Sequence, residues 1–181
     1  MKNKLTVAQL AVIGVMAAVT CVLGPLSIPI GVVPISFTNL AVYFALYALG
    51  CKKGTISYLI YLCIGFIGVP VFSAFTSGPA KLFGPTGGYL IGFIVMAVIA
   101  GLFIDKFPGK WYLHFIGMVL GTAVCYAFGT AWLAYSAGMG FAAALAAGVI
   151  PFIPGDLAKI VIAMLAGPQI RKQLIKANLY R

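Results

Sequence analysis

The chain consists of long apolar runs separated by short polar breaks or breaks rich in proline and glycine. A helix that crosses a bilayer needs about 20 residues, with a range of roughly 17 to 25. Some of the runs reach that length only with their flanking Thr, Gly and Ser residues. Six runs qualify, at residues 7–23, 35–49, 55–69, 89–104, 111–135 and 151–170. The pattern therefore predicts an all-α integral membrane protein, in which residues 1–181 form one domain of six transmembrane helices.

The composition supports this interpretation. The chain is 63% hydrophobic and only 8% charged, whereas soluble domains contain about 25% charged residues. So few charged residues cannot cover a soluble domain with polar surface. The apolar runs are also longer than the alternating segments of about ten residues that form outer-membrane β-barrels.

The basic residues predict the orientation of the helices. With six crossings both termini lie on one side of the membrane, and loops rich in Lys and Arg stay in the cytoplasm. Only Lys81 and Lys159 fall on the opposite side. The predicted cytoplasmic side carries Lys2, Lys4, Lys52, Lys53, Lys106, Lys110, Arg171, Lys172, Lys176 and Arg181. We therefore expect both termini in the cytoplasm. The short basic clusters form no continuous stripe, which argues against nucleic-acid binding.

One charged pair stands out within this pattern. The chain has two acidic residues, and Asp156 precedes Lys159 by three positions, a spacing that places both on one helix face. At membrane depth such a pair is costly unless it has a function, so we expect it to line a ligand pocket. The alternative is an ordinary helix start, with Pro154 and Asp156 in its first turn and Lys159 reaching outward to water.

A second candidate region precedes the fourth apolar run. Residues 73–88 are too long and too rich in glycine for a minimal turn, and long loops often cover binding sites. In that interpretation Phe72, Phe75 and Phe83 cover a pocket, and Thr86 caps the fourth helix. The fourth and sixth helices would both begin on the outer side, so both N-termini could face one ligand. An ordinary surface loop is the alternative.

Two further polar residues, Thr38 and Asn39, lie within the second apolar run. They either face the same cavity or form hydrogen bonds between helices. The pattern alone favours neither interpretation.

Sequence motifs of catalysis are absent. The chain has no H-x-x-x-H, no G-x-S-x-G, no pair of neighbouring carboxylates and no G-x-x-x-x-G-K-[ST] phosphate loop. We therefore expect neither an enzyme, nor a metal site, nor ATP hydrolysis by this chain itself. A structural membrane protein with a satisfied helix start is the main alternative to a binding function.

Three segments carry a family resemblance. They are Val-Pro-Ile-Ser at 33–36 followed by Thr38 and Asn39, then F-G-P-T-G-G-Y-L-I-G-F at 83–93, then F-I-P-G-D-L-A-K at 152–159. In this order and spacing the chain resembles, over nearly its whole length, the BioY family. These are the biotin-specific substrate-binding membrane subunits of energy-coupling factor transporters.

The resemblance implies biotin uptake across the bacterial cytoplasmic membrane, with biotin as the transported ligand and no cofactor. It also implies docking, on the cytoplasmic side, to a transmembrane coupling protein that carries two ATP-binding-cassette ATPases. Family contacts with biotin lie on the loop before the fourth helix, at the start of that helix and on the P-G-D-x-x-K turn. Carried over to this chain, they predict a site made of Asn39, Thr76, Ser77, Gly78, Lys81, Tyr89, Asp156 and Lys159.

Two departures from the family pattern affect this site. Where some members have Asn in the glycine-rich loop, this chain has Thr76-Ser77-Gly78, and where some have Arg after G-G-Y, it has Leu90. The carboxylate of biotin then needs another cation, for which Lys81 is the candidate. Asp156 and Lys159 would meet the ureido group, which offers two N–H donors and one carbonyl acceptor.

Overall fold

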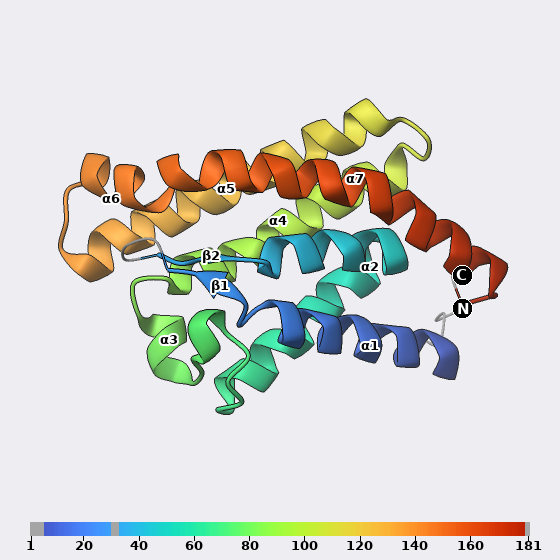
Figure 1. Ribbon diagram of the computed structural model, residues 1–181, viewed down its shortest axis with the longest axis horizontal. Helices are drawn as coiled ribbons and strands as arrows, with labels where there is room; N and C mark the ends of the chain where they lie inside the picture. The colour runs from blue at the N-terminus through green and yellow to red at the C-terminus, as the bar shows by residue number, and fades with distance from the viewer. Residues whose placement is uncertain (1–5, 30–32, 180–181) are drawn as a thin grey trace.

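The computed structural model describes residues 6–29 and 33–179 as a bundle of helices with one short hairpin. Most helices run along the long axis of the molecule (Figure 1). The elements in order are α1 Val7–Leu23, β1 Ser27–Ile28, β2 Ile35–Ser36, α2 Thr38–Phe66, η1 Ser73–Phe75, α3 Pro79–Phe83, α4 Gly87–Lys106, α5 Trp111–Ala137, α6 Phe141–Gly148, η2 Ile150–Phe152 and α7 Ile153–Lys176.

Helix α2 supplies two crossings, because its backbone breaks at Gly50. This glycine has φ 79° and ψ 175°, a conformation that is essentially restricted to glycine. The chain reverses direction there, so the two halves of α2 form separate legs (Figure 1). The second and third predicted crossings are these two legs.

Three predicted boundaries around these legs are wrong. The third crossing begins at Cys51, directly after the break at Gly50, and not at Thr55. The second crossing begins at Thr38 and not at Ile35, because Ile35 and Ser36 pair with Ile28 and Ser27 in an antiparallel hairpin. The third ends at Phe66 and not at Val69. Gly68, with φ 112°, and then Pro70 cannot continue a helix.

The fourth and fifth crossings follow the predicted runs, whereas the last helix continues to Lys176, beyond the predicted end at Ile170. Three stretches are long and apolar enough to span a membrane: Gly87–Lys106, Trp111–Ala137 and Phe141–Lys176. The apolar helix α1 is shorter, at 17 residues. With the two legs of α2, the described residues form an all-α membrane fold with six apolar helical segments. The last crossing begins with Pro154 in its first turn, as expected from the proline signal.

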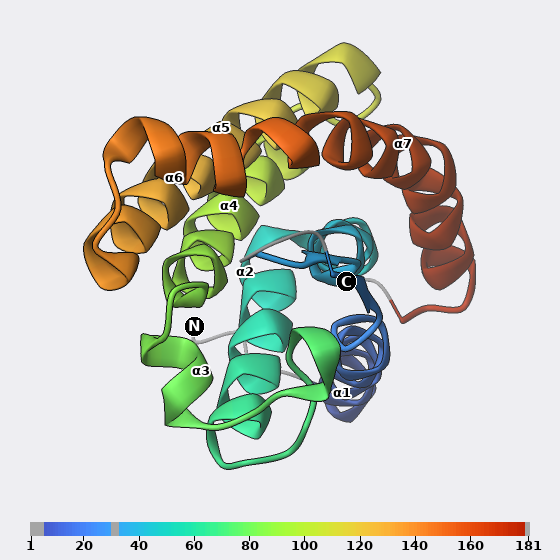
Figure 2. The same ribbon diagram turned by 60° about the vertical axis from the view of Figure 1, so that its left-hand side comes forward.

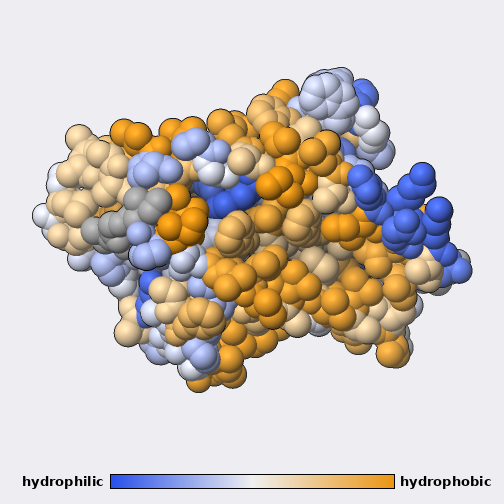
Figure 3. Space-filling model, in the orientation of Figure 1, coloured by the Kyte–Doolittle hydropathy of each residue, from blue (hydrophilic) through white to orange (hydrophobic). Residues whose placement is uncertain are grey.

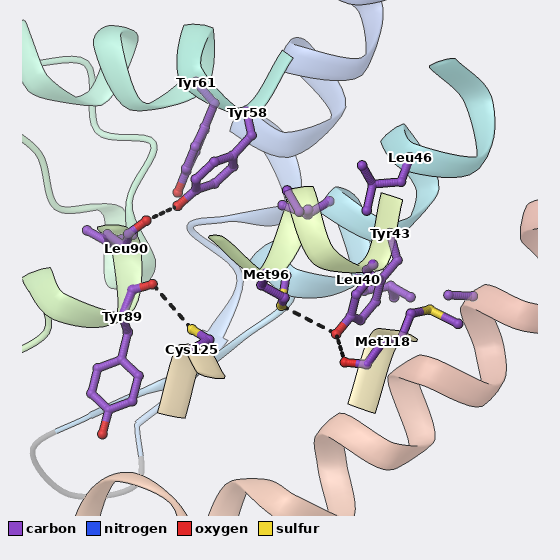
Figure 4. Close-up of a cluster of buried hydrophobic side chains, with 14 of the residues drawn as sticks. Leu40, Tyr43, Leu46, Tyr58, Tyr61, Tyr89, Leu90, Met96, Met118 and Cys125 are labelled. Atoms are coloured by element: carbon purple, nitrogen blue, oxygen red, sulfur yellow. Dashed lines mark hydrogen bonds between the residues drawn. The ribbon is translucent and has the colours of Figure 1, made fainter. Parts of the chain in front are cut away.

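Helix α2 lies at the centre, where it contacts α1, α4 and α7 (Figure 2). Four of its tyrosines, Tyr43, Tyr47, Tyr58 and Tyr61, are almost completely buried. Their hydroxyls find partners inside the bundle: Tyr58 donates to the carbonyl of Leu90 at 2.8 Å (Figure 4). Since the lipid core offers no water, such internal partners are required. The face of the molecule seen in Figure 3 is largely hydrophobic.

Glycines let α4 approach its neighbours closely. A Cβ on Gly92 would lie 3.0 Å from the sulfur of Cys125 on α5, and one on Gly101 would lie 2.7 Å from the Cα of Cys51 on α2. Small residues at such crossings allow the van der Waals packing that holds membrane helices together. The close packing positions the start of α4 firmly against α5.

The two ends of the molecule differ in charge, in the predicted sense. The break in α2, the link between α4 and α5, the start of α1 and the end of α7 share one end (Figure 1). Asp105 joins three of these segments there: it accepts from Arg171 at 2.8 Å and from the Cys51 N–H at 2.7 Å. We call this the basic end. Lys2, Lys4 and Arg181 lie outside the described residues.

The break in α2 leads to a prediction about stability. Replacing Gly50 with Ala forces a Cβ into a strained backbone conformation, so the free energy of unfolding in detergent should fall by about 1–3 kcal/mol. Thermal unfolding of the purified protein measures this. The control is Gly14→Ala, where a Cβ would meet nothing within 4 Å and alanine is the better helix former. Equal melting temperatures for Gly50→Ala and wild type would contradict the assigned role of Gly50.

Candidate functional site

A cavity opens at the end of the bundle opposite the basic end. It can hold several water molecules: its volume is about 60 Å³, against roughly 10–15 Å³ for one water. The residues come from the hairpin region, α2, η1 and all helices from α4 to α7. They are Val33, Pro34, Ser36, Asn39, Ser73, Thr86, Tyr89, Leu90, Phe93, Thr122, Cys125, Tyr126, Gly148, Phe152, Asp156 and Lys159.

The carboxylate of Asp156 is the centre of the polar contacts in this cavity. Its Oδ1 accepts a hydrogen bond from Asn39 Nδ2 at 2.8 Å and one from Lys159 Nζ at 3.0 Å. Its Oδ2 accepts from the hydroxyl of Tyr126 at 2.6 Å. These donors belong to α2, α7 and α5, so one carboxylate connects three helices.

Lys159 points into the protein and does not reach outward to water. Its side chain is 7% exposed, and Nζ donates to the backbone carbonyl of Ser36 at 2.7 Å as well as to Asp156. The alternative of an outward-reaching lysine is therefore wrong. The helix-start signals are nevertheless real, because Asp156 does lie in the first turn of α7.

Asn39 satisfies both of the interpretations that the sequence left open. It lines the cavity, and it also bonds to another helix through Asp156. Thr38 is buried beside it and accepts a hydrogen bond from Ser36 Oγ at 3.0 Å. The polar start of α2 thus supports the site directly.

Tyr89 lies in a slot between α5 and α6. A Cβ at Gly129 would overlap its ring, and a Cβ at Gly148 would overlap its hydroxyl. Within the described residues, the buried hydroxyls of Tyr89 and Thr130 form no hydrogen bond. Tyr89 therefore lines the cavity while its hydroxyl is enclosed between α5 and α6.

The helices α4 and α7 both begin at the cavity, as their predicted direction required. Thr86 occupies the N-cap position of α4, but its side chain makes no capping hydrogen bond. The predicted capping contact is therefore wrong, although the position is right. Backbone N–H groups at the first turns of both helices add partial positive charge at this end.

The segment before α4 is more ordered than a loop, since it contains η1 and α3. Phe72 is fully buried and packs edge-on against Tyr61, so it does not cover a pocket. Phe75 and Phe83 are exposed and do not line the cavity.

The structure divides the predicted site residues into two groups. Asn39, Tyr89, Asp156 and Lys159 meet at the cavity. The others lie on the segment before α4, outside the lining in this structure: Thr76, Ser77, Gly78 and Lys81. From this segment Ser73 lines the cavity instead. Partial burial lowers the pKa of Lys81, since desolvation disfavours its charged form.

Helix α5 contributes to the site, although none of its residues is among the predicted site residues. Thr122, Cys125 and Tyr126 line the cavity, and the Thr122 hydroxyl lies 2.6 Å from that of Tyr43. A signal existed: with Gly129, these residues recur at spacings of three and four, which describes one helix face. No pattern in the sequence, however, pairs that face with Asp156.

Comparison with known proteins identifies relatives over almost the whole chain. Residues 1–176 match the model of the BioY family. The biotin transporter BioY2 of Lactococcus lactis subsp. cremoris (strain MG1363) is 36% identical over 172 residues, which cover 95% of this chain and 94% of that protein. The biotin transporter BioY of Thermotoga maritima is 37% identical over 165 residues, which cover 91% of this chain and 96% of that protein.

A solved structure is similar to this one as well. It is the crystal structure of the S-component for biotin from an ECF-type ABC transporter, with a TM-score of 0.86 and 32% sequence identity. The match covers 95% of each chain. The arrangement of the six helical segments is therefore shared along with the sequence.

The contact between Tyr126 and Asp156 leads to a prediction. Tyr126→Phe removes the donor to Oδ2 without changing the shape of the ring, so the free energy of unfolding should fall by about 1–3 kcal/mol. Thermal unfolding in detergent measures this. The matched control is Tyr135→Phe, because Tyr135 is 84% exposed on the same helix. If both variants melt at the same temperature, the hydrogen bond from Tyr126 does not stabilise the site.

Proposed function

The chain belongs to the BioY family, and from this premise we propose that it binds biotin for uptake into the cell as the substrate-binding component of an ECF-type transporter. It is a transport protein and not an enzyme. The relatives named as biotin transporters and the similar S-component structure support this function.

The observation that carries the proposal is the Asp156 network in a cavity with apolar walls. A carboxylate has about four acceptor positions, and Asp156 uses three, two at Oδ1 and one at Oδ2. The free position at Oδ2 suits a ureido N–H. Lys159 carries a third N–H, which suits the ureido carbonyl. Phe93 and Phe152 supply apolar area for the fused rings.

Binding has to move one wall of the cavity. Its volume is below the roughly 300–1,000 Å³ that usually enclose small molecules. The wall formed by Val33, Pro34 and Ser36 belongs to no helix: Val33 and Pro34 lie between the strands of a hairpin of two residues per strand, and Ser36 lies in its second strand. Such a hairpin is only marginally stable alone. It is therefore the wall that yields most easily, and the bond from Lys159 to the Ser36 carbonyl ties it to the site.

The remaining members of the transporter follow from the same premise. A coupling protein in the membrane and two ATP-binding-cassette ATPases supply the energy, since this chain has no phosphate loop of its own. They dock at the basic end. That end faces the cytoplasm of the cell because its loops are rich in lysine, so the cavity faces outward in the cytoplasmic membrane.

The central prediction concerns Asp156. Asp156→Asn removes a negative charge and leaves Lys159 buried without its counter-ion. Biotin affinity should therefore fall at least about tenfold, equivalent to about 1.4 kcal/mol. Titration of the purified protein with biotin measures this.

The matched control is Asp105→Asn at the basic end, which changes the same chemical group and should leave the affinity unchanged. Unchanged affinity in Asp156→Asn would show that this carboxylate does not bind biotin. If wild type itself retains no biotin, the family-based function is wrong and a structural role takes its place.

A further prediction concerns Lys81 and the carboxylate of biotin. If Lys81 binds that group, Lys81→Gln should weaken biotin binding about tenfold but leave the affinity for the uncharged biotin amide unchanged. An anion near Lys81 would also restore the charged form that burial disfavours. Equal losses for both ligands would show that Lys81 does not recognise the charge.

A further inference from the structure

A second, larger cavity lies at the basic end, far from the biotin site. It is a groove of about 840 Å³ between the beginning of α5 and the C-terminal part of α7. Its lining combines aromatic and aliphatic side chains with cations: Tyr47, Asp105, Pro108, Gly109, Trp111, His114, Pro168, Arg171, Lys172, Ile175 and Lys176. We call it the basic groove.

The sequence of α7 explains why this groove exists. Up to Gly167 the helix packs tightly on α2, because a Cβ at Gly167 would overlap the ring of Tyr47. Pro168 then interrupts the helical hydrogen bonding, which bends a helix. Beyond it α7 turns away from the beginning of α5 (Figures 1 and 2). The divergence leaves the groove between them.

The charges in the groove are unbalanced. Asp105 is the acidic residue of its lining, and Arg171 and the Cys51 N–H already occupy that carboxylate. The other acidic residue of the chain, Asp156, lies at the opposite end. Lys172 and Lys176 therefore have no acidic side chain to pair with in the described residues. Figure 3 shows hydrophilic residues gathered where α7 ends.

The apolar side chains of the groove are also unusually accessible. Trp111 is 69% exposed and Ile175 is 53% exposed, and Trp111 stacks edge-on against Tyr112. Exposed tryptophan and tyrosine at the end of a spanning helix are typical of the level of the lipid headgroups. The groove thus places exposed apolar side chains beside two lysines at the membrane interface.

We propose that the basic groove binds an anionic phospholipid of the leaflet it faces. The phosphate binds Lys172 and Lys176. The part of the acyl chains nearest the headgroup lies against Trp111 and Ile175. Anionic lipids are enriched in the cytoplasmic leaflet, and basic pockets between transmembrane helices recognise their headgroups. The ion pair of Arg171 with Asp105 forms the inner wall and stays intact. The proposal does not depend on biotin binding.

Quenching of Trp111 by brominated lipids tests this directly. The chain has two tryptophans, so Trp132→Phe leaves Trp111 as the one fluorescent tryptophan. The parent variant is reconstituted in bilayers with either phosphatidylglycerol or phosphatidylcholine, brominated near the headgroup end of its chains. Phosphatidylglycerol should quench Trp111 more strongly, at equal mole fraction, because it is enriched in the groove.

Two double variants decide the question, since each removes two positive charges, one pair inside the groove and the other pair outside it. Lys172→Gln with Lys176→Gln should lower the relative affinity for phosphatidylglycerol about tenfold. The matched control, Lys52→Gln with Lys53→Gln, lies at the same end but outside the groove lining and should change it little. A melting temperature like that of the parent shows that each variant is folded.

Three outcomes would overturn the proposal. Equal quenching by both lipids would show that the groove does not select anionic headgroups. Equal losses in both double variants would show a general surface charge effect. Loss of co-purifying transporter subunits in Lys172→Gln with Lys176→Gln, without any change in quenching, would assign the groove to a protein partner.

Discussion

The site depends on one constraint: a carboxylate and an ammonium group in a membrane bundle have no bulk water to solvate them. Asp156 and Lys159 are 7% and 6% exposed, and their hydrogen-bond partners in this structure come from the protein. Asn39 and Tyr126 donate to the carboxylate, and the Ser36 carbonyl accepts from the lysine. The pair therefore holds α2, α5, α7 and β2 in fixed relation around the cavity.

Two interruptions of helical backbone shape the molecule. They position the Asp156 network at the cavity and the groups at the basic end. The break at Gly50 folds α2 into two legs, so that Asn39 starts a helix at the cavity while Cys51 meets Asp105 at the basic end. The proline in α7 acts differently, since it leaves the first turns of that helix in place and bends its end. The same helix thus carries the ligand-binding turn at one end and the basic groove at the other.

The sequence predicted the site in part, and the reason for the division is physical. Asp156, Lys159 and Asn39 could be singled out because a polar residue or a helix start inside an apolar run costs energy and needs an explanation, whereas Tyr89 was predicted from the family resemblance. Nothing in the sequence distinguished Tyr126, since a tyrosine in an apolar helix is ordinary. Its importance comes from the 2.6 Å contact with a residue 30 positions away, which depends on how α5 and α7 are aligned.

By itself the sequence determined the class of fold, the apolar runs and the separation of charge between the two ends, because the bilayer imposes these on any chain that crosses it. It also determined where α7 begins, through local proline and aspartate signals. Only the tertiary structure decided that Phe72 belongs to the core, that Lys159 turns inward, and that α5 completes the site. Those outcomes depend on glycine contacts and on helix alignment between distant segments, which no local pattern encodes.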